Sequence, residues 1–468
     1  MKPILLIDFG STYTKVTAVD AEGEKLLGTA ASYTTVQTDV GDGLRNALEI
    51  LHEKTGGIDY AETYACSSAA GGLRMMVSGL VPELTSEAAK MASLGAGAKI
   101  IKVFSFQLTE DDLEEIKEAK PDIFLLVGGT DGGNSECIVH NAGMLASLHP
   151  DFPIVLAGNR SAVRQCQRIL EGCEVHICDN VMPKFGVLNI EPTQKEIRNI
   201  FLGRIISAKG LSQAAALLSD IIMPTPAAVL AAMNLLAQGT EGESGIGDLV
   251  AVDVGGATTD VYSLADGMPE AMNTVFRGLP EPFSKRTVEG DIGMRYSIHG
   301  IVAEAGVRRI AQLSGLPESR VQELVDYLGK NTETLPGDDE ELEKLDFALA
   351  SMAIEIAVAR HAGTMEETYT MMGQTFVQSG KDLTRVKKII VTGGSLIHTK
   401  RTAEIAAHAL FSPQSPMSLR PKRAEIWVDR KYILAAMGLL STHYPQTALR
   451  IMKKELENNG YSEQTNLR

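Results

Sequence analysis

Short apolar runs that pass directly into glycine constrain the fold of this chain more than any other feature of its 468 residues. The runs with their following turns are Ile4–Ile7 before Asp8-Phe9-Gly10, Ile123–Val127 before Gly128-Gly129, Ile154–Leu156 before Ala157-Gly158, Leu249–Val252 before Asp253-Val254-Gly255-Gly256, and Ile389–Val391 before Thr392-Gly393-Gly394. The apolar residues are continuous rather than alternating, which is typical of strands buried on both faces. These runs therefore predict the strands of largely buried sheets.

Helical patterns alternate with these strands. The predicted helices are Thr193–Ile206, Leu211–Ile222, Pro226–Ala237, Leu345–Ala362 and Lys431–Ser441. Alternation of this kind predicts an α/β protein whose parallel or mixed sheets carry helices on their faces. A content of 44 glycines and only 5% aromatic residues agrees with many tight strand-to-helix turns.

The signals recur in the same order in the two halves of the chain. An apolar strand followed by Asp-x-Gly occurs at Asp8 and again at Asp253, and a strand followed by Gly-Gly occurs at Gly128 and again at Gly393. A repeat on this scale predicts two similar lobes around one cleft. The small, acidic segment Gly239–Gly247 is expected to be a loop at the joint between them.

Charge excludes several classes of function. The formal net charge is −15, and both nucleic acids and anionic membranes require a basic face. No apolar run reaches the length of a spanning helix, and the N-terminal sequence lacks the pattern of a secretory signal. We therefore expect a cytoplasmic protein without nucleic-acid or membrane partners, with its five cysteines as reduced thiols. Cys173 and Cys178 lack a second ligand pair of similar spacing, so plain thiols are favoured over a metal site.

The first candidate site is the loop Asp8–Lys15, which opens from a strand and is rich in hydroxyl groups. A hairpin tip of this kind offers backbone N–H groups and hydroxyl donors to an anion. The strand-end carboxylate of Asp8 suits Mg²⁺ held through water. Taken alone, the loop fits a solvated hairpin turn equally well.

The second candidate is Asp253–Asp260, in which Gly255 and Gly256 allow close approach of a phosphate and Asp260 is placed to orient an attacking water. The third is Val391–Ser395, where a strand ends in two glycines beside a helical stretch. An ordinary hairpin and plain packing are the alternatives for these two. No Walker A loop is present, and no well-placed Gly-x-Gly-x-x-Gly.

The three loops resemble the ASKHA superfamily, the ribonuclease H-like fold of actin, the Hsp70 chaperones and the sugar kinases. The resemblance implies a two-lobed actin-like ATPase with a central nucleotide cleft. Asp8 and Asp253 would bind Mg²⁺ with ATP, and Asp260 would position the lytic water. The nucleotide-binding residues implied are Gly10, Ser11, Thr12, Tyr13 and Lys15 in the first loop, Gly255, Gly256, Ala257, Thr258 and Thr259 in the second, and Gly393, Gly394 and Ser395 in the third. The implied domains are residues 1–245, residues 246–428, and a helical segment 429–468 that returns to the first lobe.

A narrower resemblance, to the MutL/GlmL family, covers essentially the whole chain. The segments that carry it are IDFGSTYTK, ACSSAAGGLRM (Ala65–Met75), GLVPELTSEAAK (Gly79–Lys90), LLVGGTDGGN (Leu125–Asn134), MPTPAAVL (Met223–Leu230) and VDVGGATTDVYS. Members are encoded beside adenosylcobalamin-dependent glutamate mutase and related aminomutases, and are viewed as reactivating ATPases. The resemblance thus implies ATP and Mg²⁺ as cofactors, a mutase as the protein client, exchange of damaged for intact coenzyme, and a possible homodimer or small partner subunit.

Two other functions remain open on the same fold. One is a small-molecule kinase or ATP-dependent hydrolase, although no sugar-kinase-like substrate base is apparent. The other is an actin-like filament protein. The segment Gly128–Asn134 could complete the first lobe's share of the cleft or cap a sheet, and the basic cluster Arg420–Arg423 is expected to be a solvated loop. The cobalamin-binding signature Asp-x-His-x-x-Gly is absent, so we expect no histidine ligand to cobalt.

Overall fold

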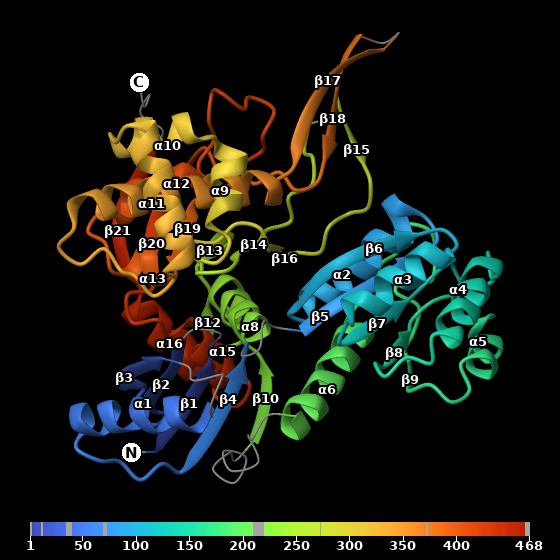
Figure 1. Ribbon diagram of the computed structural model, residues 1–468, viewed down its shortest axis with the longest axis horizontal. Helices are drawn as coiled ribbons and strands as arrows, with labels where there is room; N and C mark the ends of the chain where they lie inside the picture. The colour runs from blue at the N-terminus through green and yellow to red at the C-terminus, as the bar shows by residue number, and fades with distance from the viewer. Residues whose placement is uncertain are drawn as a thin grey trace. The chain divides into compact units, whose positions relative to one another are not determined.

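The computed structural model describes residues 2–10, 13–33, 40–68, 73–208, 220–271, 273–370 and 373–463. The chain divides into two compact units (Figure 1). The first unit is Met1–Ala231 with Ala435–Thr447, and the second is Ala232–Leu434 with Ala448–Arg468. The domain boundaries predicted from the sequence stay a prediction. No helix within the described ranges combines the length and apolar character needed to cross a bilayer.

A five-stranded sheet forms one part of the first unit, in the order β10-β4-β1-β2-β3. Its strands are β1 (Pro3–Phe9), β2 (Tyr13–Asp20), β3 (Lys25–Tyr33), β4 (Glu62–Ser67) and β10 (Asp220–Pro224). The first three strands form an antiparallel meander, β4 runs parallel to β1, and β10 runs parallel to β4. Helix α1 (Val40–Thr55) packs Leu44, Ala47 and Leu51 against the buried side chains of this sheet.

The second unit contains a six-stranded sheet in the order β16-β14-β13-β19-β20-β21. Its strands are β13 (Leu249–Val254), β14 (Thr259–Leu264), β16 (Ser284–Glu289), β19 (Lys388–Thr392), β20 (Arg423–Val428) and β21 (Glu457–Glu463). Strands β13, β14 and β16 form an antiparallel meander, and β19 and β20 follow parallel to β13. This reproduces the strand pattern of the first sheet.

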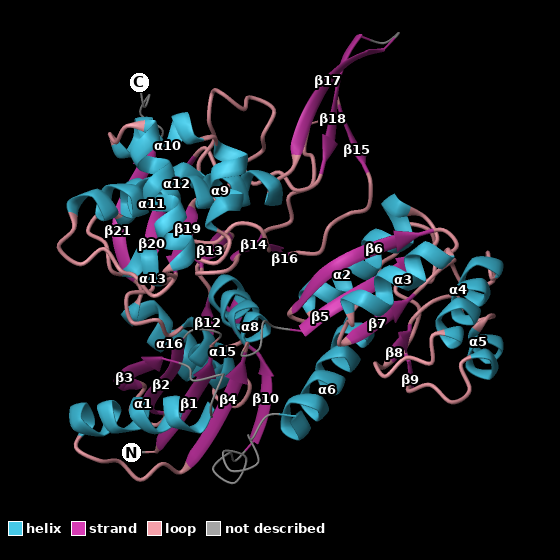
Figure 2. Ribbon diagram, in the orientation of Figure 1, coloured by secondary structure: helices cyan, strands magenta, loops and turns pink. Residues whose placement is uncertain are grey.

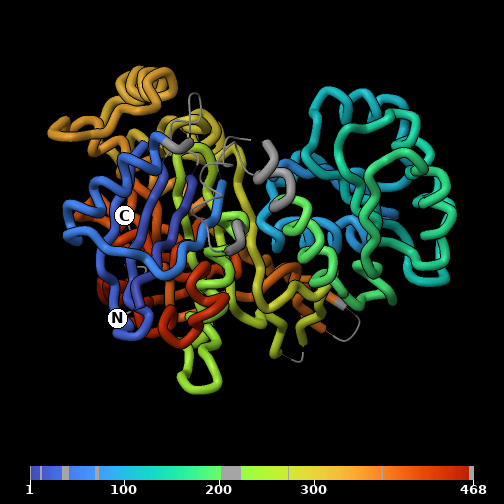
Figure 3. Tube along the Cα trace, turned by 90° about the horizontal axis from the view of Figure 1, so that it is seen from below, coloured from blue at the N-terminus to red at the C-terminus, as the bar shows by residue number. Residues whose placement is uncertain are grey.

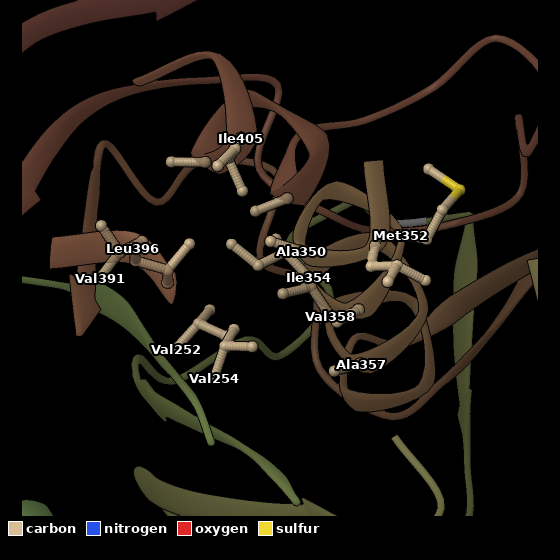
Figure 4. Packing of buried hydrophobic residues seen from close by; sticks show 14 of the residues in the cluster. Val252, Val254, Ala350, Met352, Ile354, Ala357, Val358, Val391, Leu396 and Ile405 are labelled. Atoms are coloured by element: carbon tan, nitrogen blue, oxygen red, sulfur yellow. The ribbon is translucent and has the colours of Figure 1, made fainter. Parts of the chain in front are cut away.

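The core of the second unit lies between this sheet and helix α12 (Glu340–His361). Figure 4 shows Ile354 and Val358 of α12 beside Val252 and Val254 of β13. The Asp339 side chain caps the first turn of α12 by accepting hydrogen bonds from two backbone N–H groups. Other helices of the unit are α9 (Ile298–Ala305), α10 (Val307–Ser314), α11 (Glu318–Lys330), α13 (Gly394–Ile397), α14 (Thr402–Ala406) and the 3₁₀ turn η2 (Ala407–Ala409).

The shared pattern establishes the fold class. A three-stranded antiparallel meander followed by two parallel strands is the ribonuclease H-like arrangement, and this chain contains it twice. The predicted α/β fold with duplicated ribonuclease H-like domains is therefore confirmed. The two Asp-x-Gly signals occupy equivalent places, because Asp8 lies near the end of β1 and Asp253 near the end of β13.

The first unit also holds a sheet that the sequence analysis did not predict. All of its strands are parallel, in the order β6-β5-β7-β8-β9, and Figure 2 shows helices around them. The strands are β5 (Leu73–Gly79), β6 (Ala98–Ser105), β7 (Ile123–Leu126), β8 (Ile154–Leu156) and β9 (Val175–Ile177). The helices are the π-helical turn η1 (Pro82–Ser86), α2 (Glu87–Gly95), α3 (Glu110–Ala119), α4 (Glu136–Ser147), α5 (Val163–Ile169) and α6 (Glu191–Ala208). We call residues 73–190 the insertion, because they lie between β4 and the helix that precedes β10; Figure 3 shows their trace folding back on itself.

The insertion corrects one half of the predicted repeat. Gly128 follows β7, which belongs to the parallel sheet, whereas Gly393 follows β19 of the second ribonuclease H-like sheet. The strand equivalent to β19 is β4, which ends at Ser67. The Gly128 pairing was wrong because a Gly-Gly turn suits the carboxyl end of any buried parallel strand.

Several predicted elements differ at their ends. The predicted helix Leu211–Ile222 is wrong at its last residues, which lie in β10, and residues 209–219 lie outside the described part. The predicted helix Lys431–Ser441 begins only at α15 (Leu434–Ser441). The predicted loop at Gly239–Gly247 contains the short hairpin β11 (Gly239–Thr240) and β12 (Glu243–Ser244). The other elements are α8 (Thr225–Gln238), α16 (Pro445–Glu455) and a three-stranded sheet of β15 (Thr274–Arg277), β17 (Thr364–Thr370) and β18 (Gly373–Ser379).

Candidate functional site

The first hairpin joins β1 to β2, and its closing hydrogen bond runs from Gly10 N–H to the Tyr13 carbonyl oxygen at 3.1 Å. A side chain on Gly10 would bring a Cβ within 2.5 Å of that same oxygen, so the turn requires glycine. Tyr13 is partly exposed and packs edge-on against Tyr33. Ser11 and Thr12, which were predicted to donate to phosphate, lie outside the described residues.

Asp8 is buried at the base of this hairpin and accepts hydrogen bonds from three sides. Lys15 Nζ lies 3.3 Å from its Oδ2 across the strand pair, and Thr225 Oγ1 lies 2.6 Å from its Oδ1. The Cys66 thiol also points at Oδ1, at 3.5 Å, and burial raises the pKa of that thiol well above its usual value. Asp8 and Lys15 are thus brought together as predicted, whereas Thr225, the first residue of α8, was not foreseen.

The second hairpin joins β13 to β14 and closes by the same bond. Gly255 N–H donates to the Thr258 carbonyl oxygen at 2.9 Å, and a Cβ on Gly255 would lie 2.9 Å from it. Within the described residues, the N–H groups of Gly256, Ala257 and Thr258 have no acceptor. Successive N–H groups without acceptors at an accessible turn are the arrangement that binds an anion such as phosphate.

A backing loop holds the tip of the second hairpin in place. The N–H groups of Arg295 and Tyr296 donate to the Gly256 carbonyl oxygen at 2.8 and 2.9 Å. Arg295 itself is buried and forms a two-pronged ion pair with Asp346 of α12, at 3.0 and 2.7 Å. Burial raises the pKa of the Asp346 carboxyl group, and the Arg295 guanidinium opposes that shift. The predicted Thr259 is fully buried, and its hydroxyl group donates to a backbone oxygen, which makes it a support for the turn.

Asp253 and Asp260 face each other in register across the second hairpin. Arg286, from β16, donates from Nε to Asp260 Oδ1 at 2.8 Å, and its Nη2 lies 2.6 Å from the same oxygen. Burial alone would lower the pKa of the Arg286 guanidinium, but the Asp260 carboxylate raises it. One carboxylate oxygen of Asp260 is therefore held by Arg286, whereas among the described residues Oδ2 has only a long contact of 3.5 Å with Thr258 Oγ1.

The third motif lies against the strand of the second hairpin. A Cβ on Gly393 would come within 2.3 Å of the Val254 carbonyl oxygen, and its φ of +108° is one that favours glycine. Gly394 and Ser395 begin the short helix α13, and no atom lies within 4 Å of a Cβ built on Gly394. Gly393 therefore lies beside Val254, the residue that follows Asp253. The second and third motifs thus lie together at one end of the second unit's sheet.

Two residues after β20 complete this end of the second sheet. Asp429 is buried and accepts hydrogen bonds from the N–H groups of Ile433 and Leu434, which fixes the start of α15. Tyr432 has a φ of +56°, and its hydroxyl group lies 3.5 Å from Asp253 Oδ1. Sequence reasoning missed Arg286, Asp429 and Tyr432; the only available signal was that Asp429 directly follows a buried strand.

The carboxylates fit a magnesium ion that is bound mainly through phosphate and water. No three His, Cys, Asp or Glu side chains converge on a metal position in the described ranges. Mg²⁺ is usually held by one or two carboxylates together with substrate phosphates and retained waters, so a strand-end carboxylate in either unit, Asp8 or Asp253, could serve as a ligand. Such an ion would neutralise phosphate charge during phosphoryl transfer.

Other predicted features have plain structural roles. Cys66, Cys137 and Cys166 are buried thiols, and Cys173 and Cys178 are partly exposed. Residues 128–134 follow β7 in the parallel sheet of the insertion, and side chains of Asn159 and Asn180 hydrogen-bond to them. The expectation of a solvated loop at Arg420–Arg423 is wrong for Arg420, whose side chain is 1% exposed. Arg420 lies in a run of buried residues, Ser418 to Pro421, and its Nη1 donates to the His408 carbonyl oxygen at 3.4 Å.

Comparison with known proteins gives matches that span nearly the whole chain. The family model described as MutL protein matches residues 4–456. Protein MutL of Clostridium tetanomorphum is 48% identical over 460 residues, which cover 97% of this chain and 99% of that protein. Among solved structures, a xylulose kinase from Lactobacillus acidophilus has a TM-score of 0.37 and 10% identity over 99% of this chain and 94% of that one. An ADPNP-bound activator of 2-hydroxyisocaproyl-CoA dehydratase from Clostridium difficile has a TM-score of 0.32 and 12% identity, covering 97% and 98%. Likenesses at these TM-scores say nothing about the chemistry of this chain.

Proposed function

Since this chain belongs to the MutL protein family, we propose that it is an ATP-dependent reactivating factor for an adenosylcobalamin-dependent mutase. In this proposal the client is a glutamate mutase or a related aminomutase that has lost its adenosyl radical. The factor binds the inactivated enzyme, and ATP turnover promotes exchange of damaged for intact coenzyme.

The observation that supports ATP binding is the duplicated hairpin. Each ribonuclease H-like sheet carries a strand-end aspartate, two residues before a glycine whose N–H closes the turn. We propose that the two hairpins bind the phosphates of one ATP. The N–H groups of Gly256 to Thr258 would donate to phosphate oxygens, and Lys15 would add a positive charge.

Hydrolysis requires a positioned water on the γ-phosphate. Asp260 is proposed to orient it through Oδ2, because Arg286 holds Oδ1 and fixes the plane of the carboxylate. Attack of the water oxygen on the γ-phosphorus breaks the bond to ADP, and the products are ADP and inorganic phosphate. Catalysis of this kind depends mostly on positioning and charge stabilisation.

The first test is basal ATP hydrolysis by the purified full chain with Mg²⁺ and no added small substrate. We expect turnover in the wild type and its loss in both Asp8→Ala and Asp253→Ala, with unchanged far-UV circular dichroism. Asp338→Ala is the control, because Asp338 is exposed and remote in sequence from the hairpins. If either hairpin variant keeps wild-type turnover, the two hairpins do not share one nucleotide.

The second test addresses the client. A glutamate mutase inactivated during turnover is incubated with the full chain, Mg²⁺, ATP and fresh adenosylcobalamin, and mutase activity is followed. We expect recovery that needs ATP and is absent with Asp253→Ala. ATP hydrolysis without recovery of mutase activity would support the proposed ATPase activity and contradict the proposed mutase client. Hydrolysis only with an added phosphoryl acceptor would indicate a kinase. ATP-dependent sedimentation of the chain would indicate a filament protein.

A further inference from the structure

The insertion contains a topological switch point that the nucleotide hairpins do not use. Its parallel strands lie in the order β6-β5-β7-β8-β9, so the chain moves outward from β5 to β6 and then returns to build β7, β8 and β9 on the other side. Helix α2 contacts α6, while α3 contacts α4 and α4 contacts α5 (Figure 1). In open α/β sheets of this order, ligands bind outside the carboxyl ends of the strands where the direction reverses, here between β5 and β7.

The two loops that flank this switch point are sequence features with no role in the proposed ATP site. The segment Gly79–Lys90 leaves the end of β5 through the turn η1, and Leu125–Asn134 contains the end of β7 and its glycine-rich loop. Both segments were singled out in the sequence for their resemblance to one family. The topology now brings them to neighbouring strands, because β5 pairs directly with β7.

Unsatisfied polar groups gather at the same point. Beyond the end of β7 the Gly128 carbonyl oxygen is still paired, because it accepts a hydrogen bond from Asn159 N–H at 3.1 Å. In the described part of the chain, however, the N–H groups of Gly128, Gly129 and Thr130 have no acceptor, and both glycines are buried. Ser78, next to last in β5, is fully buried and its hydroxyl group has no partner. Buried polar groups are almost always hydrogen-bonded, so these unpaired N–H and hydroxyl groups indicate a missing hydrogen-bond partner.

The loop cannot satisfy these groups by relaxing, because two buried asparagines hold it. Asn159 accepts from Gly132 N–H at 3.1 Å and donates to the carbonyl oxygens of Gly133 and Asn134 at 3.1 and 3.0 Å. Asn180 donates to the Gly129 carbonyl oxygen at 3.0 Å. The loop is therefore preorganised with its donors open, which is what a binding site requires.

A carboxylate oxygen lies next to the open donors. Asp131 accepts from Arg160 N–H at 2.9 Å and from Asn180 Nδ2 at 3.0 Å, and both bonds go to Oδ1. Its Oδ2 accepts nothing from the residues that the structure describes. A row of N–H donors beside a free carboxylate oxygen is complementary to a phosphate oxygen beside a hydroxyl group.

We propose that the switch point between β5 and β7 binds the ribose phosphate part of a nucleotide-bearing coenzyme. Phosphate oxygens accept from the N–H groups of Gly128, Gly129 and Thr130 and from the Ser78 hydroxyl group, and a ribose hydroxyl group donates to Asp131 Oδ2. The ribose phosphate could belong to a free nucleotide or to the nucleotide portion of a corrinoid coenzyme. The corrinoid source rests on the proposed function, whereas the site itself does not.

The test is equilibrium dialysis of the full chain in an Asp253→Ala background and without ADP, because ADP also carries a ribose phosphate group and would occupy the proposed site. The probes are 5′-AMP and hydroxocobalamin, which each carry a ribose and a phosphate, joined at the 5′-oxygen in AMP and at the 3′-oxygen in hydroxocobalamin. We expect at least one probe to bind, and binding to weaken at least about fivefold in Asp131→Asn and in Ser78→Ala. Binding of AMP alone identifies a free nucleotide as the source, and binding of hydroxocobalamin identifies a corrinoid. Ser93→Ala is the matched control, because Ser93 is a buried serine of the same insertion whose hydroxyl group already donates to the Ala89 carbonyl oxygen.

Measurements of thermal stability and of ATP hydrolysis distinguish a ligand-binding role of Ser78 from a structural one. Ser78→Ala should keep the thermal midpoint of the ligand-free chain or raise it, because it deletes an unpaired buried hydroxyl group, whereas Ser93→Ala should lower it. In the otherwise wild-type chain, both variants should hydrolyse ATP at the wild-type rate. The inference is overturned if neither probe binds, which would make ordered water the missing partner, or if Asp131→Asn and Ser78→Ala bind as the wild type does. Neither result would affect the proposed ATPase.

Discussion

The two hairpins share a backbone and differ in charge. Each has an aspartate at the end of its first strand, a glycine two residues later, and the same closing bond. Seven residues after the aspartate, the first hairpin carries Lys15 and the second carries Asp260. Each of these residues faces its strand-end aspartate across the pair, so the first hairpin presents a cation at the place where the second presents an anion.

The surroundings of the hairpins follow this difference. Asp8 is balanced within its own hairpin, because Lys15 lies 3.3 Å away. In the second hairpin two carboxylates face each other, and the balancing cation is Arg286 from the neighbouring strand β16. The two hairpins thus share the turn that we propose to bind phosphate, and they differ at the residue that we propose to act on the reaction. The following predictions test that division, in order of decreasing effect.

The largest difference is expected between Asp260→Asn and Lys15→Met. Loss of the carboxylate that orients water should lower kcat for ATP hydrolysis by about 100-fold or more, with little change in KM. Lys15→Met removes the charge that we propose to contact phosphate in both ground and transition states, so it should raise KM for ATP about tenfold and leave kcat within a few-fold.

Steady-state kinetics on the two variants, with Asp338→Asn as an exposed control, measure this contrast. Equal losses of kcat in the Lys15 and Asp260 variants would show that the two positions act alike, and the division between the hairpins would fail.

The hairpins themselves could be predicted from sequence because their determinants are local. A buried strand, an aspartate and a glycine within three residues are enough to specify a tight turn that needs glycine, at Gly10 and at Gly255 alike. The fold class followed for the same reason, since continuous apolar runs mark buried strands wherever they occur.

The partners of the carboxylates could not be predicted, because they arrive from distant strands. Thr225 follows β10 and reaches Asp8 only because β10 and β1 flank β4. Arg286 reaches Asp260 only because β16 pairs with β14. Strand order decides both contacts, and strand order is not encoded in any local pattern. The insertion escaped prediction for a related reason: its Gly128 turn looks the same in sequence as the one at Gly393.

Arg286→Ala should cause the next largest effect, on stability. Removing one partner of a buried ion pair leaves an uncompensated charge, and the expected loss is about 3–5 kcal/mol in the free energy of unfolding. Arg320→Ala is the matched control: Arg320 pairs with Glu323 and Glu341 but its side chain is 42% exposed, so its loss should stay below about 1 kcal/mol. Urea unfolding followed by circular dichroism measures both. A loss under about 1 kcal/mol for Arg286→Ala would show that Asp260 does not depend on its distant partner.

Gly10→Ala and Gly255→Ala compare the two turns directly. A new Cβ would lie 2.5 Å from the Tyr13 carbonyl oxygen in the first and 2.9 Å from the Thr258 carbonyl oxygen in the second. Crowding of this size costs about 1–3 kcal/mol, and we expect the greater loss of stability for Gly10→Ala. Gly394→Ala is the control, since a Cβ there meets no atom within 4 Å. Thermal unfolding of the three variants checks the order, and a greater loss at Gly255 would mean that the turns are not equivalent.

The smallest expected effect comes from a wider contrast between the units. Four cationic side chains are buried in the described part of the chain, and all belong to the second unit: Arg286, Arg295, Lys381 and Arg420. Lys381 donates from Nζ to the carbonyl oxygens of Ala265 and Phe283, both at 2.7 Å. Burial lowers the pKa of its ammonium group to about 7.

This shift makes the stability of the second unit depend on pH in a defined direction. Between the folded pKa of Lys381 near 7 and the unfolded value near 10.5, the unfolded state binds more protons, so stability rises with pH; below 7 both states are protonated and the contribution is constant. The slope is at most about 1.4 kcal/mol per pH unit. Lys381→Met should be flatter than the wild type between pH 7 and 8.5 in urea unfolding, while Lys422→Met, at an exposed site, should keep the wild-type slope. If the wild type and Lys381→Met change in parallel, the buried cations do not set the pH response of the second unit, and the contrast between the units is confined to the hairpins.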